Sequence, residues 1–345
     1  MAWEKLGTTS VGGAGVANNS WKELGRTTLG SAGDAINVTG LTAKDNMMVL
    51  THIIHSGQIQ NNMRFNNDSG NNYGNKYSND GGSDSNFTSQ ANIVNSDTYT
   101  SDVFQLDNVI NNNSSQEKLV IGGLVAENVS GAGTAPRRTE YAGKWANTSD
   151  SITQVNLINT GSGDFDTGSE VVVIGYDNDE ADSGTNYWQE LADLELSSAG
   201  DTLDTSTITA KKYLWIQAFI PEGAAHQGYI YFNNDTGANY ARRGSINGGS
   251  DITGADDDEI NWSHDTNSAK YLNMFVVNKS DKEKLCIAHY MDYGSSGAGT
   301  APNRIEWVYK WANTSAQITS VKLYNNQASS NDFPIGTKLK VWGTD

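Results

Sequence analysis

The sequence has few of the residues that form disulfides or bind nucleic acid. Its 345 residues include one cysteine, Cys286, so no disulfide can form within the chain. Lys and Arg number 23 against 40 Asp and Glu, which gives a net charge of −17. Duplex nucleic acid is bound by clustered cations that displace counterions, and the sequence has no such cluster. Nucleic acid and anionic membrane surfaces are therefore not expected partners.

Long apolar runs, long helical patterns and proline are also scarce. No apolar segment approaches the ~20 residues that a membrane-spanning helix needs, and the first residues do not resemble a signal peptide. We therefore expect synthesis in a cytoplasm. The chain has 4 prolines but 36 glycines, and polar, turn-forming residues separate short segments that alternate apolar and polar side chains. This pattern is typical of an all-β protein.

A duplication organises the sequence. The block Gly131–Pro136 (GAGTAP) precedes Lys144–Ser149 (KWANTS), and both blocks recur in the same order at Gly297–Pro302 and Lys310–Ser315. Other matched blocks keep a nearly constant separation, with the small changes that loop insertions produce. The sequence therefore predicts two homologous domains of ordinary size, at residues 21–177 and 188–345, with an acidic linker at residues 178–187.

Residues 1–20 contain a smaller repeat, because Trp3–Gly7 resembles Trp21–Gly25. This segment is a spare opening strand with no domain behind it. We predict an arm that adds as a strand to the sheet edge of a neighbouring subunit, with Trp3 and Leu6 as contacts. The alternatives are that the arm folds back on the first domain or is disordered.

Each domain is predicted to contain about eight short strands. Eight strands with long loops favour an antiparallel β-sandwich of the jelly-roll type over the seven-stranded immunoglobulin type. The strands expected in the first domain are Trp21–Leu29, Met47–Ile53, Asn62–Phe65, Val103–Leu106, Lys118–Ile121, Arg138–Trp145, Ile152–Ile158 and Glu170–Ile174.

No pattern in the sequence indicates catalysis. None of the five histidines has a histidine partner in the other repeat. Residues His52 and His55 are three apart on an expected strand and would face opposite sides of the sheet. Glycoside hydrolysis needs two carboxylates facing one cleft, and the spacing of the acidic residues singles out no pair. We therefore expect a protein that is not an enzyme and has no catalytic residues.

The densest shared polar motif is the loop FNNDxGxNY, which occurs in both repeats. Its Asn and Asp oxygens could ligate calcium, and its Tyr could offer a face to a sugar ring. The alternative is a structural loop held by side-chain-to-backbone hydrogen bonds, with Gly70 and Gly237 supplying positive φ. The candidate carbohydrate- or calcium-binding residues are Asn67, Asp68, Asn72, Tyr73, Asn234, Asp235, Asn239 and Tyr240.

A run of acidic residues occurs only in the second repeat. Asp256, Asp257 and Asp258 are candidate metal ligands for calcium, and the alternative is a solvated acidic loop. No other cofactor is expected.

The GAGTAP and KWANTS blocks are predicted to be structural. Their tryptophans, Trp145 and Trp311, would fill the sandwich cores, and their asparagines, Asn147 and Asn313, would turn the chain.

The ordered blocks SAGD, FNNDxGxNY, EKL, GAGxAPxR and KWANTS resemble single-domain virion proteins encoded by marine viruses. The resemblance covers about residues 21–175 and 188–343. It implies a jelly-roll structural protein on the virion surface, such as a capsid, capsid-decorating or fibre subunit, here as a tandem duplication.

A protein of this kind would assemble with itself and with other virion proteins. We expect a homotrimer, because three copies of two similar sandwiches make a ring of six similar lobes, and closed symmetry is usual for self-associating proteins. The alternative function is a carbohydrate-binding or receptor-binding module that recognises host-surface glycans.

Overall fold

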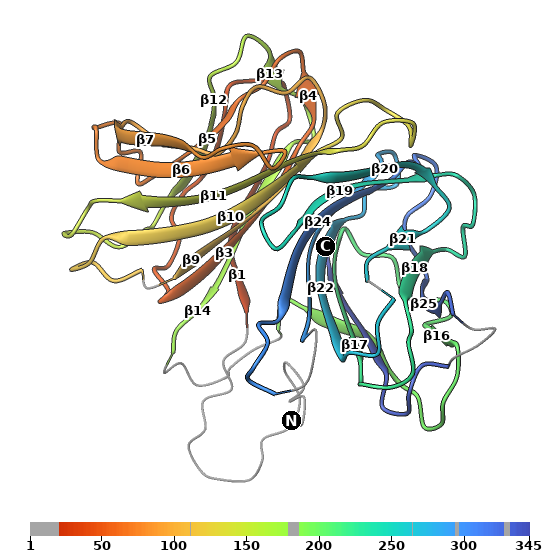
Figure 1. Ribbon diagram of the computed structural model, residues 1–345. Coiled ribbons are helices and arrows are strands. Elements are labelled where there is room, and N and C mark those ends of the chain that lie inside the picture. Colours follow the sequence, from red (N-terminus) through yellow and green to blue (C-terminus); the bar gives the residue numbers. More distant parts are fainter. Residues whose placement is uncertain (1–20, 111, 179–185, 264, 294–296, 328–331) are drawn as a thin grey trace. The chain divides into compact units, whose positions relative to one another are not determined.

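The computed structural model describes residues 21–110, 112–178, 186–263, 265–293, 297–327 and 332–345 (Figure 1). The regular structure in these ranges is β-strand throughout. No helix among the described residues has the length and apolar character needed to cross a membrane. The predicted arm contacts, Trp3 and Leu6, lie outside the described residues, as does most of the predicted linker.

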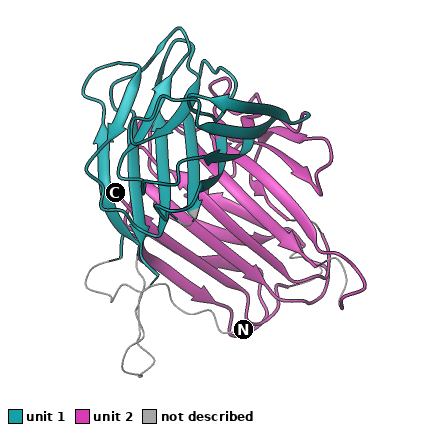
Figure 2. Ribbon diagram, turned by 90° about the vertical axis from the view of Figure 1, so that its left-hand side faces the viewer, with its two compact units in different colours: residues 1–79, 83–124, 139–187 teal, residues 80–82, 125–138, 188–345 magenta. Residues whose placement is uncertain are grey.

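The chain divides into two compact units (Figure 2). Unit 1 comprises the described residues up to Asn79, Ser83–Leu124 and Thr139–Tyr187. Unit 2 comprises Trp188–Asp345 together with two loops of the first sequence repeat, Asp80–Gly82 and Val125–Arg138. The second unit therefore takes up the first GAGTAP block.

Unit 1 is a sandwich of two main antiparallel sheets. The larger sheet contains, in spatial order, β1 (Lys22–Thr28), β14 (Glu170–Tyr176), β3 (Asn46–Ile53), β9 (Val103–Ile110), β10 (Lys118–Ala126), β11 (Arg137–Trp145), β6 (Tyr73–Asn79) and β7 (Ser85–Gln90). The smaller sheet contains β2 (Ala35–Val38), β12 (Val155–Asn159), β5 (Asn61–Phe65) and β8 (Ile93–Val94), and β13 (Asp164–Phe165) pairs with β4 (His55–Ser56).

Unit 2 has the same two sheets with the same strand order. Its larger sheet contains β15 (Gln189–Glu195), β26 (Lys338–Thr344), β17 (Tyr213–Ile220), β22 (Lys270–Val277), β23 (Lys284–Asp292), β24 (Asn303–Trp311), β19 (Tyr240–Ile246) and β20 (Ile252–Asp257). Its smaller sheet contains β16 (Thr202–Asp204), β25 (Val321–Asn325), β18 (Gly228–Phe232) and β21 (Ile260–Asn261). The predicted all-β pair of tandem jelly-roll sandwiches is confirmed.

The prediction of about eight strands per domain was too low. Most strands missing from it are short or polar, and β7 (SNFTSQ) has a single large apolar side chain, Phe87. Hydrogen bonds to β6 place this segment at the edge of the sheet, where one face needs little apolar surface. Apolar alternation alone therefore does not reveal such strands.

Aromatic side chains fill the space between the sheets. Trp145 and Trp311 are both fully buried, which confirms their predicted core position. Trp145 stacks on Tyr73 with ring centroids 6.3 Å apart, and Trp311 stacks on Tyr240 at the same separation. Such aromatic pairs add ~1 kcal/mol beyond the burial of their surface.

The asparagines after these tryptophans turn the chain, as predicted. The side-chain oxygen of Asn147 accepts hydrogen bonds from the backbone N–H groups of Ser149 and Asp150, both at 2.8 Å. Asn313 accepts the equivalent bonds from Ser315 and Ala316 at 2.9 Å.

Candidate functional site

The FNNDxGxNY loop of unit 1 satisfies its polar groups internally. One oxygen of Asp68 accepts the backbone N–H of Gly70 at 2.8 Å. The other accepts the side-chain amide of Asn72 at 2.9 Å and the indole N–H of Trp145 at 2.7 Å. Burial raises the pKa of Asp68, but the hydrogen bonds from Trp145 and Asn72 outweigh it, so the net pKa is lowered. This carboxylate therefore anchors the core tryptophan.

Unit 2 reproduces this network with matching distances. Asp235 accepts the indole N–H of Trp311 at 2.7 Å and the amide of Asn239 at 2.9 Å. The hydroxyls of Tyr73 and Tyr240 bond to the loop backbone, and both rings are buried in the cores. Burial raises the pKa of both hydroxyls. Neither ring therefore offers a face to a sugar.

The glycines of these loops do not supply positive φ, so that part of the structural interpretation was wrong. The left-handed backbone belongs to Asn66 and Asn67, with φ of 51° and 56°, and to the equivalent Asn233 and Asn234, each with φ of 54°. Gly70 serves close packing instead, because a Cβ atom there would lie 2.8 Å from the Asn72 amide nitrogen. Asparagine tolerates the left-handed region better than most residues.

The acidic run of unit 2 does not gather its carboxylates around one point. Among the described residues, no three His, Cys, Asp or Glu side chains form a group that could hold a metal ion. Asp257 instead lies 3.7 Å from the Arg242 guanidinium. Burial, followed by the hydrogen bond and charge of Asp258, raises the pKa of Glu259 to about 8. The run thus lies at the end of β20 and in the bend that follows it, and the raised pKa favours the protonated form of Glu259 near neutral pH.

Unit 2 holds the first GAGTAP loop through buried charged groups. Glu283 accepts the backbone N–H of Gly131 at 2.5 Å and the hydroxyl of Ser130 at 3.1 Å. The fully buried Lys310 donates to the carbonyl oxygens of Glu127 and Val129. Burial lowers the pKa of Lys310, although Glu283 and Glu127 favour its charged form.

Three further contacts secure the same loop. Arg138 pairs with Asp251 at 2.6 Å, and both side chains are buried. The backbone N–H of Asp256 donates to the carbonyl oxygen of Ala132 at 2.9 Å, and Arg243 donates to that of Pro136 at 2.7 Å. A charge-assisted hydrogen bond contributes ~2 kcal/mol, and leaving a buried charge unpaired costs more. These contacts therefore favour this loop over other segments. We call the residues that bind it, Glu283, Lys310, Asp251, Asp256 and Arg243, the loop seat.

The loop seat could not be predicted from the sequence. Its partners, such as Arg138 and Asp251, are far apart in the chain, and their repeat equivalents gave no sign that the two copies differ. The only signal was that GAGTAP is preserved in both repeats, although its residues are too small to form much of a core.

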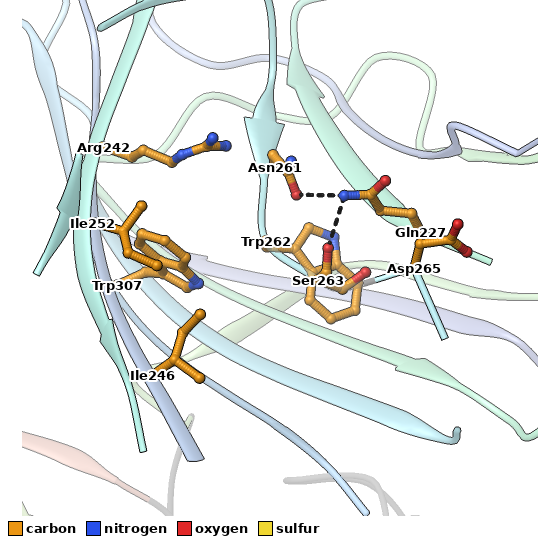
Figure 3. A pocket seen from close by; sticks show the side chains of 9 residues that line it. All are labelled: Gln227, Arg242, Ile246, Ile252, Asn261, Trp262, Ser263, Asp265 and Trp307. Atoms are coloured by element: carbon orange, nitrogen blue, oxygen red, sulfur yellow. Dashed lines mark hydrogen bonds between the residues drawn. The ribbon is translucent and has the colours of Figure 1, made fainter. Parts of the chain in front are cut away.

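A pocket of about 250 Å³ lies in unit 2 between β19, β20 and β24 of the larger sheet and β21 of the smaller one (Figure 3). One side presents a guanidinium and apolar groups, and the other side presents amides, a hydroxyl and a carboxylate. The lining residues are Arg242, Ile246, Ile252 and Trp307 on the first side and Gln227, Asn261, Trp262, Ser263 and Asp265 on the second.

The polar wall of the pocket is prearranged. The Gln227 amide donates to the Asn261 side chain and to the Ser263 carbonyl, both at 3.1 Å. On the facing wall, the Arg242 guanidinium lies 5.7 Å from the Trp307 ring. At the equivalent place in unit 1, Asn75 bonds to the backbone of Val94 in β8 at 2.7 Å.

Comparisons with known proteins show no family. Neither a protein-family model nor a curated protein sequence matches the chain. Among solved structures, the chain is similar to the mouse laminin alpha1 chain, domains LG4-5, with 13% sequence identity and a TM-score of 0.21. That alignment covers 92% of this chain and 88% of the laminin chain.

Proposed function

We propose that this chain is a non-enzymatic structural protein of a virus particle surface, a capsid, capsid-decorating or fibre subunit that assembles with itself and with other virion proteins. The resemblance of its ordered motif blocks to virion proteins of marine viruses supports the location. The loop seat is the observation that supports assembly, because it shows a preserved loop bound by buried ion pairs and backbone hydrogen bonds.

The internal organisation suits a passive structural role. In both units the shared polar loop holds a core tryptophan, through Asp68 and Asp235. Both motif tyrosines are buried. The polar groups that the two repeats share thus serve rigidity, which a particle surface requires. We further propose a homotrimer, the closed state in which two similar sandwiches per chain make six similar lobes.

Particle association tests this proposal. Particles from the source virus are banded by density and treated with protease under mild conditions, and the chain is quantified by mass spectrometry. The proposal expects the chain to band with the particles at a fixed number of copies. A chain found only in the soluble fraction of infected cells would refute it.

A second candidate function is recognition of a host-surface glycan at the unit 2 pocket. The observation that favours it is the facing pair of walls, one with the Arg242 guanidinium beside Trp307, the other with the bonded amides of Gln227 and Asn261. Small-ligand sites combine apolar walls with a few placed polar groups, although this pocket has room for little more than one sugar residue.

The variant Arg242→Asn tests this candidate, because Asn is the residue that unit 1 carries at the equivalent position. Glycan-array binding by the full chain should fall at least tenfold, while Lys322→Asn, at a partly exposed position on β25 of the same unit, should leave it unchanged. Equal binding by all three proteins, or binding by none, would exclude the pocket as a glycan site.

A further inference from the structure

Each chain carries the GAGTAP loop twice, but only one copy is seated. In the first copy Ala132, Ala135 and Pro136 are buried. In the second copy every residue of Gly297–Pro302 is exposed. The second loop thus has the sequence of the seated copy but is exposed along its whole length.

The exposed loop and the seated loop share the backbone features that can be compared between them. Gly131 and Gly297 have the same φ of 87°. The backbone N–H of Arg138 donates to the Asp80 side chain at 2.9 Å, and that of Arg304 donates to Asn247 at 2.9 Å. Docking of the second loop would therefore cost little ordering entropy, which is the main benefit of preorganisation.

Unit 1 carries the charged groups of the loop seat in exposed form. Glu117 and Lys144, the equivalents of Glu283 and Lys310, pair with each other at 3.0 Å on the surface. Lys76 and Asp84, the equivalents of Arg243 and Asp251, pair at 3.4 Å. Unit 1 therefore has the same sign of charge as unit 2 at each of these four positions.

The surface between these charges is apolar in both units, yet buried only in unit 2. On β23, Leu285 and Ile287 are 1% and 5% exposed. Their equivalents on β10 of unit 1, Leu119 and Ile121, are 59% and 58% exposed. Two large adjacent apolar side chains with a charged rim are typical of a protein contact surface.

The backbone of the two seats also agrees. Asp256, whose N–H binds the loop in unit 2, has a φ of 51°, and its unit 1 equivalent Ser89 has a φ of 52°. The backbone N–H of Ser89, which would donate to the carbonyl oxygen of Ala298, is therefore held in the same local conformation as that of Asp256.

We propose that the Gly297–Pro302 loop and Arg304 of one chain dock on the outer face of unit 1 of a second copy, at Glu117, Leu119, Ile121, Lys144, Lys76 and Asp84. This contact repeats the loop seat between chains. It rests on the proposed function of self-assembly, for which it names the contact. Because the loop lies in one unit and the seat in the other, the interface is heterologous and passes from chain to chain, forming a ring or an open filament.

The central ion pair allows a charge-swap test. In the proposed contact Arg304 takes the place of Arg138 and Asp84 that of Asp251, whose pair is buried in unit 2. Either single substitution, Arg304→Asp or Asp84→Arg, places like charges opposite each other. Each should weaken self-association of the full chain at least about thirtyfold, the loss expected when a buried charge pair is broken.

Analytical ultracentrifugation over a concentration series measures this association. The double variant in one chain should regain it, because every contact then has opposite charges again. An equal mixture of the two single variants should regain it only in part in a trimer, because contacts between unlike variants restore opposite charges but an odd-membered ring keeps one contact between two like variants. Ile121→Lys should also dissociate the oligomer. Because Ile121 is exposed, this substitution should not disturb the folding of unit 1. Glu195→Lys, which changes an exposed acid paired with Lys338, is the matched control and should associate like the natural chain.

Two results would overturn the inference. One is a natural chain that sediments as a monomer at every concentration. The other is an oligomer that the single substitutions leave intact. Failure of the proposed function is distinguishable from either, because it is a chain that associates through this contact but is absent from purified particles.

Discussion

Replacing Asp68 by Ala removes the carboxylate that ties the FNNDxGxNY loop of unit 1 to the core tryptophan. The substitution deletes three hydrogen bonds, from Gly70, Asn72 and Trp145. It also leaves the buried indole N–H of Trp145 without its acceptor. An unsatisfied buried donor costs ~1–3 kcal/mol, and bonds to a charged group contribute ~1.5–3 kcal/mol each without being additive. We expect unit 1 to lose about 3 kcal/mol of unfolding free energy.

Urea denaturation followed by hydrogen exchange and mass spectrometry measures this loss unit by unit. Peptides of β5, β6 and β11 should lose protection in Asp68→Ala, while peptides of unit 2 keep it. Asp235→Ala should give the mirror result, and Ser69→Ala, an exposed position in the same loop, should change neither unit. A loss below ~1 kcal/mol in both aspartate variants would refute the reasoning, since surface substitutions fall in that range.

The pH dependence has a definite sign at this residue. The folded-state pKa of Asp68 is lowered, so its stabilising effect is present above the unfolded value of about 3.9. It is lost as pH falls through the folded pKa, because the carboxyl must then be protonated. The unfolding free energy of unit 1 should consequently fall less steeply as pH is lowered below about 4 in Asp68→Ala than in the natural chain.

The remaining predictions concern two groups in unit 2. Glu259 has a folded pKa of about 8 against an unfolded value of about 4.3, so the folded state binds more protons and unit 2 should lose stability as pH rises from about 4 to 8. Urea melts of Glu259→Gln across that range should be flatter than those of the natural chain, with Glu190→Gln as control, and parallel curves would contradict the assignment. Cys286 is fully buried and burial raises the pKa of its thiol, so an aromatic disulfide reagent should label it at least ~100-fold more slowly in the native chain than in denaturant. Rapid labelling of the native chain would show that β23 opens.

The architecture was predictable because it depends on features that the sequence states locally. The duplication and the short alternating segments indicate two β-sandwiches. Large aromatic side chains such as Trp145 and Trp311 are on average highly buried, so a core position is expected for them. The turn made by Asn147 follows from the tendency of Asn side chains to bond the backbone two residues on.

Backbone conformation within the polar loop was harder to predict. Glycine is the usual residue for positive φ, yet Asn66 and Asn67 take that conformation while Gly70 provides room for Asn72. Both choices satisfy the same sequence pattern, and only the path of the chain decides between them.

The loop seat was beyond sequence reasoning for a different reason. Arg138 and Arg304 are identical residues in identical motifs, yet one is buried against Asp251 and the other is exposed beside Glu306. The difference arises from which unit takes up each loop, and this information is absent from the motif itself. Tandem repeats are therefore most informative where their equivalent residues differ in burial.

Electron cryomicroscopy of purified particles at side-chain resolution tests the central claim most directly. The account predicts repeated density for this chain on the particle surface, with each unit recognisable by its paired eight- and four-stranded sheets. It also predicts a Gly297–Pro302 loop seated on unit 1 of the adjacent copy. Particles whose fully assigned surface contains no copy of this chain would contradict the proposed function.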